Sequence, residues 1–147
     1  MKNTRNVKKY SFENIDFINS AFLILTPILL LVFGALWIHF EGFSYSVVAF
    51  SVVTYILSGI SITAGYHRLF AHKTYDSHPI VKIFFLIFGA TAFQNSVLKW
   101  ASDHRQHHSK VDTNDDPYNI KEGFFFAHMG WILLEKNSHV KERYAKD

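Results

Sequence analysis

Apolar residues in this chain are gathered into long runs that contain no charged side chain. Two of these runs cover residues 17–40 and residues 44–66, which is 24 and 23 residues. About 20 consecutive apolar residues in an α-helix are enough to cross the hydrocarbon core of a bilayer. The first run is too long for the core of a signal peptide, and no cleavage site of small residues follows it. The pattern therefore predicts two transmembrane helices.

Polar and small residues indicate how the two helices form a hairpin. Glu41-Gly42-Phe43 separates the two runs and predicts a short turn. Pro27 is expected to kink the first helix, which lipid-embedded helices tolerate. Small residues in both helices offer surfaces for close helix packing; they are Gly34, Ser58, Gly59, Ser61 and Gly65.

Two shorter apolar stretches follow, at residues 80–93 and 124–134. The first has 14 residues and contains Lys82, so it is short for a membrane span. We expect both stretches to form interfacial or buried helices. Breaks between these pieces are expected at His78-Pro79 and at Asp116-Pro117. The fold class that this order of elements predicts is an all-α integral membrane protein, with a cytosolic or interfacial helical region after the hairpin.

The distribution of basic residues predicts the orientation of the hairpin. Residues 1–16 contain Lys2, Arg5, Lys8 and Lys9, whereas the turn between the two long runs contains no Lys or Arg. Because cytoplasmic flanks of membrane spans are enriched in basic residues, we expect the N-terminus and the end of the second span on the cytoplasmic side. The expected organisation is a cytoplasmic segment at 1–16, a transmembrane hairpin at 17–66 and a cytosolic or interfacial region at 67–147.

Composition excludes several classes of site. The net charge is +3, and the basic residues form no stripe interleaved with stacking aromatics, so no nucleic-acid partner is expected. The chain has no cysteine, which excludes disulfides, thiolate catalysis, and zinc or iron–sulfur sites held by cysteine. Any metal ion must therefore be held by nitrogen and oxygen ligands.

The histidines carry the strongest chemical signal in the chain. Eight of the nine follow residue 66, and five of these form two groups beside apolar runs. In the second group, His104, His107 and His108 stand at positions i, i+3 and i+4, which share one face of a helix. Asp103 is placed to accept a ring N–H and so to orient a ligand. We expect these three imidazoles to converge on one or two metal ions.

The first group consists of His67 and His72, which are five residues apart. On an ideal α-helix the two rings would diverge by roughly 140°, because each residue turns the helix by about 100°. We therefore expect the pair either to bracket a helix end or to serve different ions. A site shared by both groups requires residues 80–93 to stay at one surface, since a crossing would place the groups on opposite sides of the membrane.

The other histidines are assigned roles that do not involve metal. His39 lies at the far end of the first span, His78 precedes a proline in a turn, and His139 is in a polar tail. His128 lies in an apolar segment, where a buried, hydrogen-bonded role is expected in preference to a ligand role. Ligand type leaves iron, zinc and copper open. Zinc would favour hydrolysis, and iron would favour oxygen activation against a lipid.

Several motifs resemble those of the membrane fatty acid desaturase family, in particular the acyl-CoA Δ9 desaturases of the stearoyl-CoA type. Residues 67–72 match the first histidine box of that family, HxxxxH, and residues 104–108 match the second, HxxHH. The resemblance extends from the first span to about Lys136. Other matching residues are Gln94, Asn95, Trp100, Ala101, Asp103, Asp115, Asp116, Pro117 and the segment 123–131.

The resemblance implies the first part of a four-span helical membrane domain with a cytosolic cap that holds two iron ions. It implies that O2 is used to insert a cis double bond, at Δ9, into a fatty acyl-CoA. Electrons would come from a donor protein of the ferredoxin, rubredoxin or cytochrome b5 type. The implied iron ligands are His67, His72, His104, His107 and His108. The implied substrate contacts are Gln94 and Trp100 along the acyl chain, and Asn95, Asp103 and Lys136 near the coenzyme A head group.

The chain also departs from the pattern of that family. Ser102 and Glu135 stand where the family has basic residues near the head group, so desaturation is supported more strongly than coenzyme A as the acyl carrier. A third histidine box and a second pair of spans do not occur in these 147 residues, so we expect the N-terminal part of a desaturase. Two alternatives are a related histidine-box lipid hydroxylase and an inactive, truncated membrane remnant.

Overall fold

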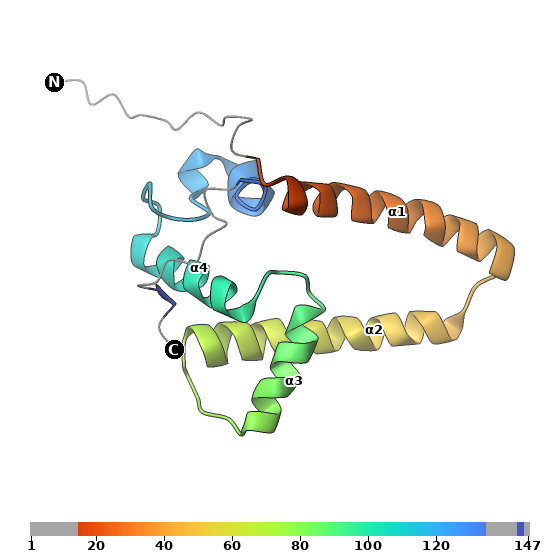
Figure 1. Ribbon diagram of the computed structural model, residues 1–147, viewed down its shortest axis with the longest axis horizontal. Helices are drawn as coiled ribbons and strands as arrows, with labels where there is room; N and C mark the ends of the chain where they lie inside the picture. Colours follow the sequence, from red (N-terminus) through yellow and green to blue (C-terminus); the bar gives the residue numbers. More distant parts are fainter. Residues whose placement is uncertain (1–14, 135–143, 146–147) are drawn as a thin grey trace.

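The computed structural model describes residues 15–134 and 144–145, and its elements are almost all helical (Figure 1). Their order is α1 (Phe17–Glu41), α2 (Tyr45–Ile60), η2 (Ser61–Ala71), α3 (Pro79–Ala90), α4 (Val97–Lys110), η3 (Ile120–Glu122) and η4 (Phe126–Gly130). The only β-structure in the described residues is an isolated antiparallel bridge between Ile15 and Leu134. The predicted all-α fold class is confirmed.

Two long apolar helices extend from a common turn (Figure 1). The first is α1, with 25 residues, and the second combines α2 and η2, with 27 residues; each is long and apolar enough to cross a membrane. No residue of α1 or α2 is buried within the chain. Large apolar side chains exposed along two such helices are stable only in apolar surroundings, so this is a membrane-associated chain.

Local capping explains where the two long helices begin and end. The Asp16 carboxylate caps α1 by accepting the backbone N–H of Asn19 at 3.0 Å, and the Ser44 hydroxyl caps α2 by accepting that of Val47 at 3.4 Å. Gly42 ends α1 at φ 79°, a left-handed conformation that glycine adopts at little cost. The predicted turn is confirmed, and α1 runs unbroken through Pro27.

In the part of the chain that the structure describes, the glycines of the hairpin pack closely against another helix at the end that carries the histidines. A Cβ atom on Gly65 would lie 2.6 Å from the Cβ atom of Phe85, so α3 lies directly against the backbone of η2 there. A Cβ atom on Gly34 or Gly59 would meet nothing within 4 Å. The predicted packing role is therefore right for Gly65 and wrong for Gly34 and Gly59, because α1 and α2 diverge from their turn (Figure 1).

The core lies where α3 and α4 both pack on η2. Its buried apolar side chains are Tyr66, Leu69, Ala71, Phe85 and Ala101, and Phe126 on η4 is buried as well. Buried polar side chains lie in the same part of the chain; they are Ser61, Ser102, Asp103, Gln106, Asp116 and Asn119. The core is therefore small and mixed, and it surrounds the segments that carry the two histidine groups.

The two short apolar stretches form short helices as predicted. In the first, His78 caps α3, since its Nδ1 accepts the backbone N–H of Ile80 at 3.3 Å. In the second, Phe126 and Gly130 are buried one helical turn apart, while His128 is exposed and stacks on Phe124 with ring centroids 5.7 Å apart. The prediction that His128 is buried is wrong, because its side chain lies on the outer face of this helix.

Candidate metal centre

The π-helical geometry of η2 brings the first two histidines together. The backbone N–H of His72 donates to the carbonyl oxygen of His67 at 3.0 Å, a hydrogen bond between positions i and i+5 that is typical of a π-helix. The ring centroids of the two histidines lie 4.6 Å apart. The wide divergence expected for an ideal α-helix therefore does not arise. The pair lies at the end of η2, as one of the two alternatives predicted, but both rings enter the same cluster.

The second group of histidines lies on α4, as the spacing predicts. This helix begins after Ser96, whose hydroxyl accepts the backbone N–H of Lys99 at 3.2 Å. His104 and His108 are one turn apart on the helix face that turns toward η2, and their Nε2 atoms lie 3.1 Å apart. His107 lies beside them, but its ring is not part of the cluster that the other histidines form.

Four imidazoles from the two groups converge on one point. His67, His72, His104 and His108 each offer a ring nitrogen, and these four atoms lie within 4.8 Å of one another. The Nε2 atom of His104 is the centre of the cluster, since it lies 3.0 Å from that of His72 and 3.1 Å from that of His108. The prediction that both groups share one site, and so lie on one side of any membrane, fits this geometry.

The separation of these nitrogens suits a metal ion. Two imidazole nitrogens bound to one ion at about 2.1 Å lie about 3.0 Å apart for an angle of 90° and about 3.4 Å apart for a tetrahedral angle. The observed 3.0 and 3.1 Å correspond to ligands on neighbouring positions of a single ion. Neutral nitrogen donors without any thiolate suit intermediate metals such as iron, zinc and copper.

Two histidines of the cluster, His104 and His72, are held in a form that can bind metal, because their surroundings disfavour protonation. Burial, followed by the charges of neighbouring histidines, lowers the pKa of His104 from 6.5 to about 3. Burial and the same kind of neighbours, with Arg105, also lower the pKa of His72. A metal ligand must be the neutral imidazole, so the environment that disfavours the imidazolium keeps the nitrogen lone pairs available at neutral pH.

Arg105 connects the two helices that carry the cluster. Its Nη1 donates to the carbonyl oxygens of Phe70 at 3.1 Å and Ala71 at 3.4 Å, which are among the last carbonyls of η2. Its Nε donates to the carbonyl oxygen of Tyr144 at 2.7 Å. Carbonyls at a helix end have no partner within the helix, so a guanidinium from α4 both satisfies them and holds α4 in position beside His72.

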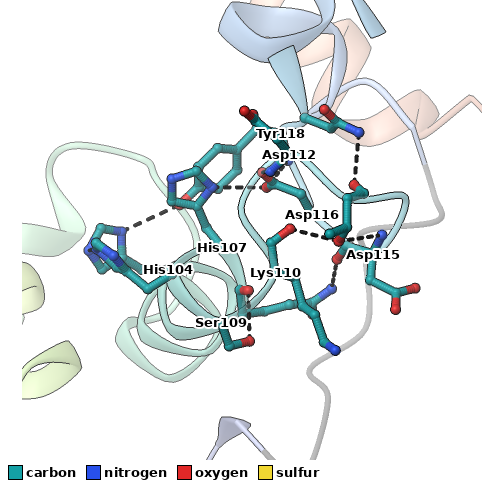
Figure 2. A network of polar contacts seen from close by, with 12 residues as sticks. His104, His107, Ser109, Lys110, Asp112, Asp115, Asp116 and Tyr118 are labelled. Carbon is teal, nitrogen blue, oxygen red and sulfur yellow. Dashed lines mark hydrogen bonds and ion pairs between the residues drawn. The ribbon is translucent and has the colours of Figure 1, made fainter. Parts of the chain in front are cut away.

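Two aromatic residues contact the His104 ring. Trp100, one turn earlier on α4, stacks on His104 with ring centroids 5.0 Å apart and planes 25° apart. The Tyr118 hydroxyl lies 3.4 Å from Nδ1 of His104 (Figure 2). If Nε2 binds a metal ion, Nδ1 carries the proton and donates to this hydroxyl oxygen, which orients the ring. Burial raises the pKa of Tyr118, as do the nearby carboxylates of Asp116 and Asp103.

A carboxylate reaches His107, and it is not the one that sequence spacing suggested. Nδ1 of His107 lies 2.9 Å from Oδ1 of Asp116 (Figure 2). Asp103, which was expected to orient a histidine, is paired with Lys99 at 2.7 Å. Sequence reasoning missed Asp116, Tyr118 and Arg105 as partners of the cluster. For Asp116 and Tyr118, the one available signal in the sequence was their position in a short polar segment directly after α4.

The predicted substrate contacts gather at a cavity beside the cluster. This cavity, of about 270 Å³, is lined by Gln94, Asn95, Trp100 and Asp103 together with His104. Nε1 of Trp100 donates to Oε1 of Gln94 at 3.0 Å, so the two residues predicted along the acyl chain contact each other. Of the other predictions in this part of the chain, Lys136, Glu135 and His139 lie outside the described residues.

A second and larger cavity, of about 500 Å³, has no histidine in its wall. It lies between the beginning of α1 and η4, and the two are joined there by a hydrogen bond from the Asp16 N–H to the Leu133 carbonyl at 2.9 Å. Its lining is mainly apolar; it includes Ile15, Ile24, Phe125, Phe126, Leu133 and Leu134. The cavity that adjoins the candidate metal centre is therefore the smaller and more polar of the two.

The chain is similar to fatty acid desaturases. It is 46% identical over 113 residues to the Delta(9)-fatty-acid desaturase fat-6 of Caenorhabditis elegans, which is 77% of this chain and 33% of that protein. It is 45% identical over 97 residues to stearoyl-CoA desaturase 2 of Mus musculus, covering 66% of this chain and 27% of that protein. It is 37% identical over 133 residues to an acyl-CoA Delta(11) desaturase of Trichoplusia ni, covering 90% and 37%. The chain spans about a third of the length of the curated relatives it matches. No protein-family model matches it.

Proposed function

Because this chain belongs to the fatty acid desaturase family, we propose that it forms part of an acyl-CoA desaturase, an enzyme that inserts a cis double bond into a saturated fatty acyl chain. One observation carries the proposal: four imidazoles converge within 4.8 Å beside a cavity of about 270 Å³. We assign the double bond to Δ9, since two of the relatives carry that position in their names.

We assign two iron ions to the centre. His67, His72, His104 and His108 would hold the first, and His107 would contribute to the second. The bound pair would activate O2 for removal of two hydrogens from the acyl chain, which is chemistry that no side chain of this chain can supply. The protein's own contribution at His104 is to keep the imidazole neutral through burial and to orient its ring through the Trp100 ring and the Tyr118 hydroxyl.

We assign the cavity beside His104 to the acyl chain. A saturated chain has no polar group near the reacting carbons, so its position must be set by the shape of the walls. The hydrogen bond between Trp100 and Gln94 holds the indole ring in place along this wall. Asn95, Asp103 and Lys136 are assigned to the coenzyme A head group. Ser102, which stands where the family has a basic residue near the head group, is buried in the packing of α4.

We propose that the hairpin spans the membrane with its histidine end at the cytoplasmic face. The basic residues before α1 and the absence of Lys and Arg from the turn support this orientation. The division into segments 1–16, 17–66 and 67–147 is part of the same proposal, with helical structure continuing past residue 66 to Ala71. A soluble electron-donor protein of the ferredoxin, rubredoxin or cytochrome b5 type would then reach the centre from the cytosol.

Complementation of a host strain that has no Δ9 desaturase tests the proposal. The whole reading frame in which this chain is encoded is expressed in that strain, and the cellular fatty acids are identified by gas chromatography and mass spectrometry. We expect monounsaturated fatty acids with a cis Δ9 bond to accumulate. The His104→Ala variant serves as the control, since it removes the central nitrogen of the cluster, and it should yield none.

Other products would contradict the proposal in distinct ways. Hydroxylated fatty acids, which retain their hydrogens and gain an oxygen atom, would identify a lipid hydroxylase instead. Expression of the protein at a normal level with bound iron, and with fatty acids unchanged in growing cells, would indicate an inactive membrane protein. Unsaturated products that persist in the His104→Ala variant would show that the histidine cluster is not the reacting centre.

A further inference from the structure

The Asp116 carboxylate lies at the centre of the polar segment that follows α4 (Figure 2). Only 3% of the residue is exposed. Its Oδ1 accepts from His107 Nδ1 at 2.9 Å and from the backbone N–H of Tyr118 at 3.1 Å, and its Oδ2 accepts from the backbone N–H of Asp112 at 2.9 Å. A buried carboxylate is stabilised only when such donors surround it, so these three hydrogen bonds fix both of its oxygens.

The segment around Asp116 is itself held by hydrogen bonds that do not involve the histidines. Asn119 Nδ2 donates to the Thr113 carbonyl at 2.8 Å, and the Gln106 side-chain amide donates to the Asp115 carbonyl. Gln106 is 3% and Asn119 is 3% exposed, so these bonds are largely shielded from water. Asp116 therefore projects from a turn that is anchored to α4, and its carboxylate cannot move away from His107 without breaking several buried hydrogen bonds.

This arrangement determines which nitrogen of His107 can bind a metal ion. A carboxylate that accepts from Nδ1 places the ring proton there, and the lone pair is then on Nε2. The ring plane is set by Tyr118, which stacks on His107 with ring centroids 4.3 Å apart and planes 29° apart. His107 is thus oriented as a metal ligand would be, although it lies outside the cluster of four histidines.

We propose that Asp116 is a positioning residue that commits His107 to bind metal through Nε2, at a position separate from the four-histidine cluster. This inference rests on the proposed function, since it requires that the centre holds metal. It adds that the two metal positions depend on different residues. The four-histidine cluster depends on the contact between η2 and α4, whereas the position served by His107 depends on the turn that carries Asp116.

Anaerobic titration of the purified, metal-free chain with Fe²⁺ tests the inference, with a chromophoric chelator as the competitor. The variants are Asp116→Ala and Asp116→Asn, and the matched control is Asp115→Asn, which removes the neighbouring exposed carboxylate. We expect Asp116→Ala to weaken one of two binding events by 10–100-fold, the usual effect of losing a carboxylate behind a metal-bound histidine. The tighter binding at the cluster and both events in Asp115→Asn should be unchanged.

The Asp116→Asn variant keeps the inference falsifiable if the alanine variant does not fold. The amide has the same shape but a single acceptor oxygen for three donors, so we expect Fe²⁺ binding at the His107 position to weaken about tenfold or more. In a His107→Ala background the same substitution should have no further effect on Fe²⁺ affinity. A role limited to the fold would not produce this dependence on His107.

The outcomes separate this inference from the proposed function. If the wild-type chain binds no Fe²⁺ with measurable affinity, the proposed metal centre is wrong and the inference fails with it. If the wild-type chain binds Fe²⁺ and the folded Asp116→Asn variant binds it equally tightly at every position, the inference is overturned and the proposed function stands. Folding is followed independently by circular dichroism.

Discussion

The hairpin of α1 and α2 and the histidine region, formed by η2, α4 and residues 111–119, place opposite demands on their side chains. No residue of α1 or α2 is buried within the chain. The buried polar residues among residues 15–134 and 144–145 all lie in the histidine region; they are Ser61, Ser102, Asp103, Gln106, Asp116 and Asn119. The hairpin requires only an apolar surface of sufficient length, which many sequences provide. The histidine region requires particular atoms at particular distances, and so should tolerate substitution poorly.

The largest expected effect is the loss of Fe²⁺ affinity when His104 is replaced, with His39 in the hairpin as the matched control. Replacing His104 with Ala removes the nitrogen that lies 3.0 and 3.1 Å from its two neighbours, and we expect Fe²⁺ affinity at the cluster to fall more than about 100-fold. His39→Ala, at the far end of the hairpin, should leave Fe²⁺ affinity unchanged. Metal content after dialysis, measured by mass spectrometry, gives the comparison. Equal loss in both variants would mean that the effect is on folding in general.

Two glycines test whether the regions differ in packing. Gly65→Ala would place a Cβ atom 2.6 Å from the Cβ atom of Phe85, and we expect the free energy of unfolding to fall by about 1–3 kcal/mol. Gly59→Ala meets no atom within 4 Å and lies in a helix interior, where alanine is favoured by up to about 1 kcal/mol. Denaturation in detergent, followed by circular dichroism, measures both. Similar destabilisation by the two substitutions would mean that the two regions do not differ in how closely their helices pack.

Acidification should weaken the histidine region before the hairpin. The pKa of His104 is about 3 in the folded chain and near 6.5 in the unfolded chain. Between these pH values the unfolded state therefore binds a proton at His104 that the folded state does not bind. The contribution of His104 to stability is therefore fully present above pH 6.5 and is lost as the pH falls toward 3. Unfolding of the metal-free chain at pH 7.5, 6 and 5 measures this loss, and His104→Gln should flatten it. If stability depends on pH equally in the wild-type chain and in His104→Gln, His104 is excluded as the source of that dependence.

The smallest expected effect concerns the wall of the cavity beside the cluster. The bond from Trp100 Nε1 to Gln94 Oε1, at 3.0 Å, should contribute about 0.5–1.5 kcal/mol. Trp100→Phe and Gln94→Leu, measured singly and together, give their coupling energy in a double-mutant cycle. A coupling near zero would mean that the hydrogen bond does not hold the indole ring in solution.

Periodicity and composition were sufficient for the elements of this chain but not for their contacts. The two apolar runs, the turn at Gly42 and the placement of three histidines on one helix all follow from short-range patterns. The short helix near residue 128 was predicted as well, but the side of it that faces the core was not. His128 proved exposed because Phe126 and Gly130 occupy the inner face. A helix of five residues is too short for its sequence pattern to define a face.

The available ligands were readable from the amino acids alone: five clustered imidazoles, no thiolate, and two apolar stretches long enough to anchor them at a membrane. That these imidazoles converge on one site could not be read from the amino acids alone. It depends on a π-helical register that turns His72 back toward His67, on an approach of His72 to His104 across 32 positions, and on a turn that returns Asp116 to His107. Such contacts arise from the packing of α3 and α4 on η2, and local spacing along the chain carries no information about the energy of that packing.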